Sequence, residues 1–175
     1  MKRNVKKRNS NIKKEGAMRE ILNPYKKYEG YNCFGCAPGN ECGLQMTFYE
    51  DGDEIVSKWE PKDFFQGYLK VLHGGIQSAL IDEIGSWVVL IKGRTSGVTS
   101  KLEVKFKKAV YVNKGTITLR AKLHEKRRNL YTVYVRLFDA ENTLCTEGYV
   151  TYFTFSKQKA EKHFYFPDYE EFFKD

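Results

Sequence analysis

The 175-residue chain is 41% hydrophobic and 15% aromatic, which is enough apolar material for one folded domain and excludes wholesale disorder. Its net charge of +8 is concentrated at the start, because residues 1–16 hold seven Lys and Arg against Glu15 alone and residues 17–175 carry only +2. No apolar run approaches the ~20 residues of a membrane helix, and no apolar stretch follows the first basic residues as in a secretory signal. We therefore expect a cytoplasmic protein without membrane insertion.

The first part of the chain divides into two segments. Residues 1–20 are polar and basic and lack hydrophobic periodicity, so we expect a disordered tail. Such a tail can bind nucleic acid or an anionic membrane, but a solvated leader is the simpler interpretation, and we expect no other contact with nucleic acid. Residues 21–43 form a loop-rich entry segment with six Gly and Pro residues.

The entry segment also carries three cysteines. Cys33 and Cys36 have the C-x-x-C spacing of half a zinc site, and Cys42 follows. A fourth ligand would have to come from Cys145 or from a histidine, and neither is near in sequence. We therefore predict a structured turn with small buried thiols and no metal.

Hydrophobic patterning predicts two strands, over residues 44–49 and 55–59, around the turn at residues 51–53. Residues 75–92 are predicted to form the one long helix, because apolar side chains recur at three- and four-residue steps from Ile76 to Ile91.

Four more strands are predicted after the helix from apolar–polar alternation, with turn residues between them. They cover residues 98–107, 116–124, 130–138 and 143–155. Two strands, a long helix and an antiparallel run of strands indicate an α+β domain over residues 44–156, followed by an aromatic C-terminal extension, residues 157–175.

The segment from Phe65 to Gly75, FQGYLKVLHGG, resembles the entry to the central helix of hotdog-fold thioesterases of the PaaI-like group. Asp82 stands nine residues after His73, as the helix carboxylate of that family does, and the strand opening at Gly97-Val98-Thr99 is also similar. The resemblance covers residues 33–155. It implies the hotdog fold, a curved antiparallel sheet wrapped around one long central helix, and assembly as a homodimer or a pair of dimers.

The resemblance further implies hydrolysis of acyl-CoA or related acyl thioesters, with coenzyme A as part of the substrate and no cofactor. Gly74 and Gly75 begin the helix, where backbone N–H groups attract negative charge, and the Gly74 N–H would be the oxyanion donor. Asp82 would act as general base or nucleophile, with Thr99 of the other subunit helping to hold the water. His73 would position the substrate, because no serine stands in a Gly-x-Ser-x-Gly context.

Further residues are expected to contact the substrate. One branch of the family has Asn where this chain has Gly67, and the neighbouring Gln66 can supply the missing polar contact. Glu83 falls within the apolar stripe of the helix, so it is either paired with a basic residue or catalytic. Arg127 and Arg128 lie at a predicted turn between two strands, and we expect them to meet the phosphates of coenzyme A.

Two other functions compete with hydrolysis. A non-catalytic acyl-CoA-binding or sensor protein could share the fold, but it would not need Asp82, and residues 1–43 encode no helix-turn-helix. A hydratase is expected to have an Asp/His pair at the helix start, which this chain lacks. The acyl group cannot be inferred from the sequence, because pocket depth depends on how two subunits meet.

Overall fold

Seven strands form one antiparallel sheet in the computed structural model, which describes residues 18–174. Most of the basic tail predicted to be disordered, residues 1–17, lies outside the described residues, as does Asp175. The strand order is β1-β2-β3-β5-β6-β7-β4. The strands are β1 (Arg19–Ile21), β2 (Phe48–Asp51), β3 (Glu54–Trp59), β4 (Gly97–Phe106), β5 (Ile117–Arg127), β6 (Leu130–Phe138) and β7 (Leu144–Thr154).

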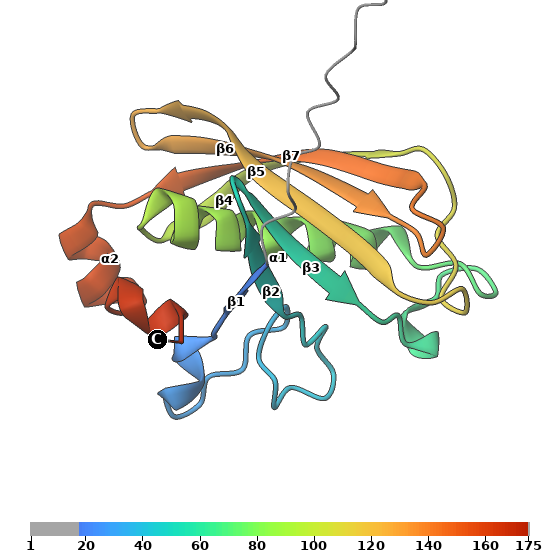
Figure 1. Cartoon of the computed structure of the whole chain (residues 1–175), viewed down its shortest axis with the longest axis horizontal. Helices are drawn as coiled ribbons and strands as arrows, with labels where there is room; N and C mark the ends of the chain where they lie inside the picture. Colours follow the sequence, from blue (N-terminus) through green and yellow to red (C-terminus); the bar gives the residue numbers. More distant parts are fainter. Residues whose placement is uncertain (1–17, 175) are drawn as a thin grey trace, which may run out of the picture.

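Two α-helices accompany the sheet, α1 (Gly74–Gly93) and α2 (Lys157–Phe164). Short 3-10 turns lie at Pro24–Lys27, Asp63–Phe65 and Tyr169–Phe172. The long helix α1 runs along the inner face of the curved sheet, and α2 lies at one end of the molecule beside the entry segment (Figure 1). The α+β class and the one central helix predicted from the sequence are thus confirmed.

The core lies between α1 and the sheet. The helix residues predicted as its apolar stripe, such as Leu80, Ile84 and Trp87, are buried there. The side of α1 that carries Asp82 is also covered, since Val89 is buried and Gly85 lies against the hydroxyl of Tyr152 in β7. The curved sheet therefore covers this side of the helix as well.

Helix α1 is long and apolar enough, by length and composition, to cross a membrane. It is the one helix of this kind among residues 18–174, and half of its most apolar window is buried. The expectation that no segment of the chain is long and apolar enough to cross a membrane is therefore wrong for α1. Its hydropathy follows from its place in the core, where a helix covered by a sheet on several sides is apolar around most of its circumference.

Two elements at the ends of the described chain were missed. Strand β1 begins at Arg19, inside the segment predicted to be disordered, and pairs with β2. The aromatic extension contains α2 and closes the core, since Phe172 is fully buried with its ring centroid 6.0 Å from that of Trp87. A three-residue strand and an eight-residue helix are too short for a clear periodicity, so their residues alone do not reveal them.

Strand β4 is an edge of the sheet, paired on one side only, with β7. Most of its residues are exposed, including three large apolar ones: Val98 is 45%, Leu102 37% and Phe106 52% exposed. A ten-residue edge strand with apolar side chains is a template for pairing with another strand.

Candidate active site

The first part of the candidate site is the N-terminus of α1. His73 caps the helix, and its Nδ1 accepts a hydrogen bond from the Gly75 N–H at 2.9 Å. A ring nitrogen that accepts is unprotonated, so the neutral imidazole carries its hydrogen on Nε2 and can donate from there. The Gly75 N–H is thereby used, whereas the Gly74 N–H has no acceptor among residues 18–174. Gly74 and the His73 Nε2–H are thus the donors available to a ligand.

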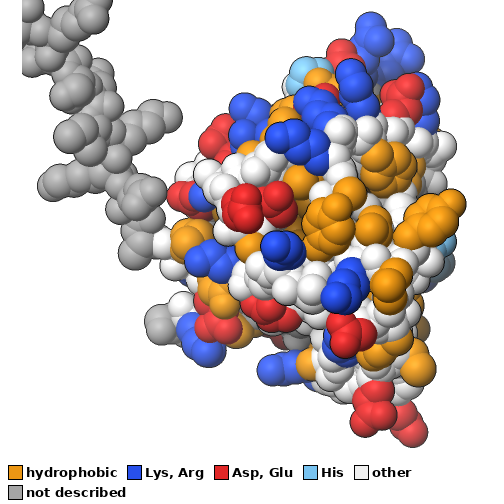
Figure 2. Space-filling view, turned by 90° about the vertical axis from the view of Figure 1, so that its right-hand side faces the viewer, with side chains coloured by type: hydrophobic (Ala, Val, Ile, Leu, Met, Phe, Trp, Pro, Cys, Tyr) orange, Lys and Arg blue, Asp and Glu red, His pale blue; other side chains and the backbone are white. Residues whose placement is uncertain are grey.

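A surface hollow of about 500 Å³ lies beside this helix end. It is lined by Gly67, Tyr68, Val71, Leu72, His73, Gly74, Gln77 and Phe106. A Cβ at Gly67 would come within 3.1 Å of the His73 ring, so the absence of a side chain there leaves the imidazole its space. Hydrophobic side chains gather among basic ones on this end of the molecule (Figure 2).

Gln66 does not line this hollow. Its side-chain oxygen accepts from the Lys70 N–H at 2.7 Å, and Lys70 has a left-handed backbone with φ of 62°. Gln66 thus holds the loop that leads into α1 through its side-chain oxygen, and its contact with substrate stays a prediction.

The second part of the candidate site surrounds Asp82. Thr99 Oγ1 donates to Asp82 Oδ1 at 2.8 Å, and the Tyr152 hydroxyl lies 2.6 Å from the Asp82 carbonyl oxygen and 3.2 Å from Oδ1. Thr99 and Tyr152 are direct partners across β4 and β7, so their side chains leave the sheet on the same face. The expectation that Thr99 comes from the other subunit is wrong, because Asp82 of its own chain already holds it.

Tyr152 was not predicted as a site residue, since in the sequence it is one aromatic among several in a strand. Burial, with the neighbouring Asp82 charge as a second cause, raises the pKa of Tyr152 well above its usual range. The phenol therefore stays protonated at neutral pH and remains a donor. Oδ1 has two donors and Oδ2 has none among residues 18–174, which leaves Oδ2 to accept from a water molecule.

The two parts of the site lie apart within one chain. Gly74 and Asp82 are eight residues apart on α1, which at 1.5 Å per residue is about 12 Å along the axis. The two parts also lie at opposite ends of β4. Phe106 lies against Gly74 at one end of the strand, and Thr99 contacts Asp82 at the other. One carbonyl group cannot contact both the Gly74 N–H and the Asp82 carboxylate of the same chain.

Glu83 points away from both parts of this site, toward the entry segment. Its Oε1 accepts from Trp87 Nε1 at 3.0 Å, and Cys33 Sγ lies 3.8 and 3.7 Å from its two oxygens. Burial, and then the Cys33 charge, raise the pKa of Glu83 to about 7. The expectation of a basic partner is wrong, since among residues 18–174 no Lys or Arg pairs with it. Glu83 also does not line the hollow beside His73.

The two cysteines beside Glu83 differ from each other in acidity. A hydrogen bond from the Cys36 thiol lowers the pKa of the Cys33 thiol to about 5. The same contact, together with burial, raises the pKa of Cys36. The prediction of buried thiols is confirmed for Cys36 and is wrong for Cys42, which is exposed, while Cys33 is half-buried.

Arg127 and Arg128 lie at the tip of the β5–β6 hairpin, as predicted, and both are exposed. The hairpin tip is tied to the end of β7 by the Thr154 N–H, which donates to the Asn129 carbonyl at 2.7 Å. Since Thr154 pairs with Gly97 at the start of β4, the two arginines belong to the Asp82 end of the sheet.

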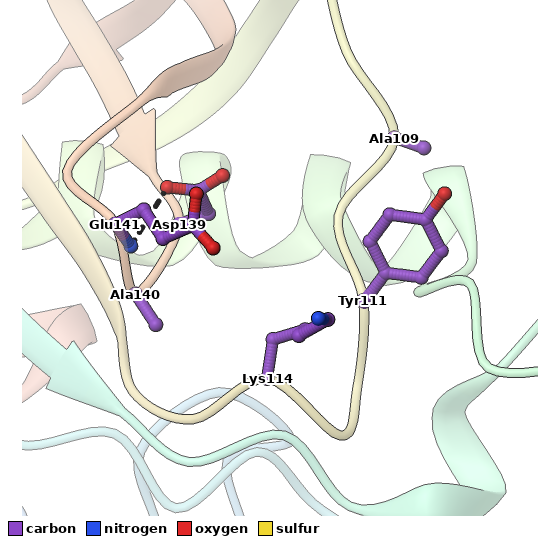
Figure 3. A pocket seen from close by; sticks show the side chains of 6 residues that line it. All are labelled: Ala109, Tyr111, Lys114, Asp139, Ala140 and Glu141. Atoms are coloured by element: carbon purple, nitrogen blue, oxygen red, sulfur yellow. Dashed lines mark hydrogen bonds between the residues drawn. The ribbon is translucent and has the colours of Figure 1, made fainter.

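Another hollow, of about 220 Å³, lies between the segment before β5 and the β6–β7 turn (Figure 3). Its charged residues are Lys114, Asp139 and Glu141. The Asp139 carboxylate accepts from the backbone N–H groups of Glu141 and Thr143, so it serves the turn. None of the residues predicted for the site lines this hollow, and its acidic wall does not suit a phosphate.

A family model described as "Thioesterase superfamily" matches residues 69–146. No curated protein matches the chain. Among solved structures, a thioesterase superfamily protein is similar with a TM-score of 0.61 and 19% identity over 66% of this chain, which spans only 57% of that protein. A thioesterase from Haemophilus influenzae is 24% identical, with a TM-score of 0.58 over 69% of this chain and 83% of its own.

A third similar structure is a hypothetical thioesterase protein from Streptococcus pneumoniae, solved with coenzyme A. It is 21% identical, with a TM-score of 0.56 over 60% of this chain and 80% of its own. The hotdog fold implied by the sequence is confirmed by these structures, and the PaaI-like group stays a prediction. The segment that the thioesterase superfamily model matches, residues 69–146, carries α1 and strands β4 to β6.

Proposed function

We propose that this protein hydrolyses acyl-CoA thioesters at a site shared by two subunits. The observation that carries the proposal is the Asp82 carboxylate, which Thr99 and Tyr152 hold by one oxygen while the other is left for water. A carboxylate oriented in this way is suited to general-base catalysis. Its position, eight residues after a helix start with a free N–H, fits the superfamily fold.

In the proposed reaction, Asp82 takes a proton from water as the water oxygen attacks the thioester carbonyl carbon. The carbonyl oxygen becomes negative, and the Gly74 N–H and the His73 Nε2–H stabilise it at the positive end of α1. Collapse of this intermediate breaks the carbon–sulfur bond. The departing coenzyme A thiolate then receives the proton from Asp82, and the carboxylic acid is released.

The two parts of the site meet if β4 pairs antiparallel with β4 of a second copy. Placing Glu103 on the two-fold axis sets Thr99 of each subunit opposite Phe106 of the other, because the bulge between Thr99 and Lys101 adds one residue on that side. Because Phe106 lies against Gly74, this register brings the oxyanion donor of one subunit to the Asp82 of its partner. The exposed apolar side chains of β4 support such an interface.

The nucleotide end of the substrate is assigned to Arg127 and Arg128. They are exposed at the Asp82 end of the sheet and can meet phosphate oxygens with charged hydrogen bonds. The Streptococcus pneumoniae protein, which was solved with coenzyme A, supports coenzyme A as the carrier. A cytoplasmic location stays a prediction of the sequence.

Hydrolysis of acyl-CoA esters of increasing chain length tests the proposal, with Asp82→Asn beside the natural protein. The rate should fall about 10²–10⁴-fold in Asp82→Asn, while acyl-CoA binding survives. Asp53→Asn, at the exposed β2–β3 turn, is the matched control and should keep full activity. Tight binding without hydrolysis of any ester would instead establish the acyl-CoA sensor.

The oligomeric state of interface variants tests whether two subunits share the site. Leu102→Glu adds two carboxylates to the two Glu103 carboxylates at the two-fold axis, so it should yield monomers without activity. Met18→Lys, at another exposed apolar position, should leave assembly unchanged. Light scattering measures both, and a fully active monomer would refute the shared site.

A further inference from the structure

A second cluster of reactive side chains lies on another side of α1, about 100° around the helix axis from Asp82. Cys33 and Cys36 of the entry segment meet Glu83 of the helix, and the three ligand atoms lie within 4.8 Å of one another. All three residues line a hollow of about 400 Å³. The proposed thioesterase mechanism uses none of them.

The spacing fits one transition-metal ion. With Zn–S near 2.3 Å and Zn–O near 2.1 Å, tetrahedral angles separate a thiolate sulfur from a carboxylate oxygen by about 3.6 Å. Cys33 Sγ lies 3.8 and 3.7 Å from the two Glu83 oxygens. Cys33 and Glu83 could therefore bind one ion with shifts of only a few tenths of an ångström, and Cys36 Sγ, which lies within 4.8 Å of both ligand atoms, needs a shift of at most about 1 Å.

Neighbouring groups already orient the ligand atoms. The Tyr31 hydroxyl lies 3.0 Å from Cys36 Sγ, and Asn23 Nδ2 donates to the same sulfur at 3.6 Å. Trp87 Nε1 donates to Glu83 Oε1, which leaves Oε2 for an ion. Such supporting hydrogen bonds are typical of metal sites, where they fix the direction of each ligand.

The close packing and the charge of the cluster both favour a bound cation. A Cβ at Gly35 would lie 2.2 Å from the Glu83 carboxyl carbon, so the C-x-x-C turn can close over the carboxylate only without a side chain there. Two thiolates and a carboxylate would place three negative charges together, and among residues 18–174 no Lys or Arg pairs with Glu83 to offset them. A divalent cation supplies the missing positive charge.

We propose that Cys33, Cys36 and Glu83 bind one Zn²⁺-type ion, whose fourth position opens to the hollow. The ion ties the entry segment to α1, because two ligands come from one and the third from the other. Two thiolates favour Zn²⁺ over Mg²⁺ or Ca²⁺, which prefer oxygen ligands alone. The site is separate from Asp82 and does not depend on the proposed thioesterase activity.

The test measures Zn²⁺ binding to the full-length protein in the presence of a thiol-free reductant, and uses Co²⁺ as a spectroscopic probe. We expect one Zn²⁺ per chain, and with Co²⁺ the thiolate charge-transfer and visible bands of a tetrahedral ion. Cys33→Ser and Cys36→Ser should each weaken Zn²⁺ binding more than about 100-fold, beyond the 10–100-fold of a residue that only supports a ligand. Cys42→Ser, an exposed thiol of the same segment, is the matched control and should bind as the natural protein does.

Two further variants keep the test informative if a cysteine variant fails to fold. Glu83→Gln keeps the shape of the side chain and should weaken Zn²⁺ binding at least about tenfold, whereas Tyr31→Phe should weaken it about 10–100-fold and keep the tetrahedral Co²⁺ spectrum. The proposal is overturned if the natural protein binds no Zn²⁺ while its thiols are reduced. It is equally overturned if Glu83→Gln binds as tightly as the natural protein, or if Cys42→Ser loses the ion.

Discussion

The hydroxyl of Tyr152 offers a sharp test of how the Asp82 carboxylate is held. Tyr152→Phe removes the donor that lies 2.6 Å from the Asp82 carbonyl oxygen and 3.2 Å from its carboxylate, and leaves the buried ring in place. Thr99 still donates to the same carboxylate. The variant therefore changes the orientation of Asp82 without removing its charge.

The size of the effect follows from the lost contacts. One hydrogen bond to a charged group is worth about 1.5–3 kcal/mol, and each 1.4 kcal/mol changes a rate tenfold, so kcat should fall about 10–100-fold. KM should stay unchanged, since Tyr152 lies beneath Asp82 and does not line the hollow beside His73. The carbonyl oxygen shares the same hydroxyl proton, and losing this shared contact should cost about 1 kcal/mol of stability, so Tm should drop by roughly 2–4 °C.

Steady-state hydrolysis of the best acyl-CoA substrate and thermal unfolding measure these changes. The decisive comparison repeats Tyr152→Phe in the Asp82→Asn background, where the hydroxyl has no carboxylate to orient. There the further loss of kcat should be less than about threefold, because residues that act through one group are not additive. An equal loss in both backgrounds would show that Tyr152 acts independently of Asp82 and would refute this role.

Three other predictions follow from packing and charge. Gly85→Ala would place a Cβ 2.5 Å from the Tyr152 hydroxyl, so it should lower kcat and Tm at least as much as Tyr152→Phe; an alanine variant with full kcat would contradict the packing. In the metal-free protein, the raised pKa of Glu83 means that the folded state holds a proton between pH 4.5 and about 7 that the unfolded chain releases, so the contribution of Glu83 to stability should fall as pH rises through this window, by at most about 3 kcal/mol. Cys33, whose pKa is lowered to about 5, contributes a slope of opposite sign above pH 5, so urea unfolding should show stability rising more steeply with pH in Glu83→Gln than in the natural protein, and identical slopes would contradict the assignment. Gly35→Ala should impair Zn²⁺ binding, whereas Gly39→Ala, with no neighbour within 4 Å, should not; equal Zn²⁺ affinity in the two variants would count against the cluster.

Much of the architecture could be predicted from local sequence patterns. The three- and four-residue spacing of apolar residues located α1 within one residue at each end, and alternation located β6 over the same residues as the structure. Both succeed because an element packed against a core must repeat its apolar residues with its own geometric period. His73 and Asp82 could be placed on one helix for the same reason, since their spacing lies within a single element.

The contacts that define the two sites were decided by tertiary structure. Tyr152 lies 70 residues from Asp82 in the sequence and meets it only because β7 and β4 carry Tyr152 and Thr99 to one face of the curved sheet. Glu83 lies 50 residues from Cys33, and the sequence placed it on the apolar stripe without showing which segment covers it. Periodicity reports which face of an element is buried, but the partner across that face depends on how the whole chain folds, which no local pattern contains.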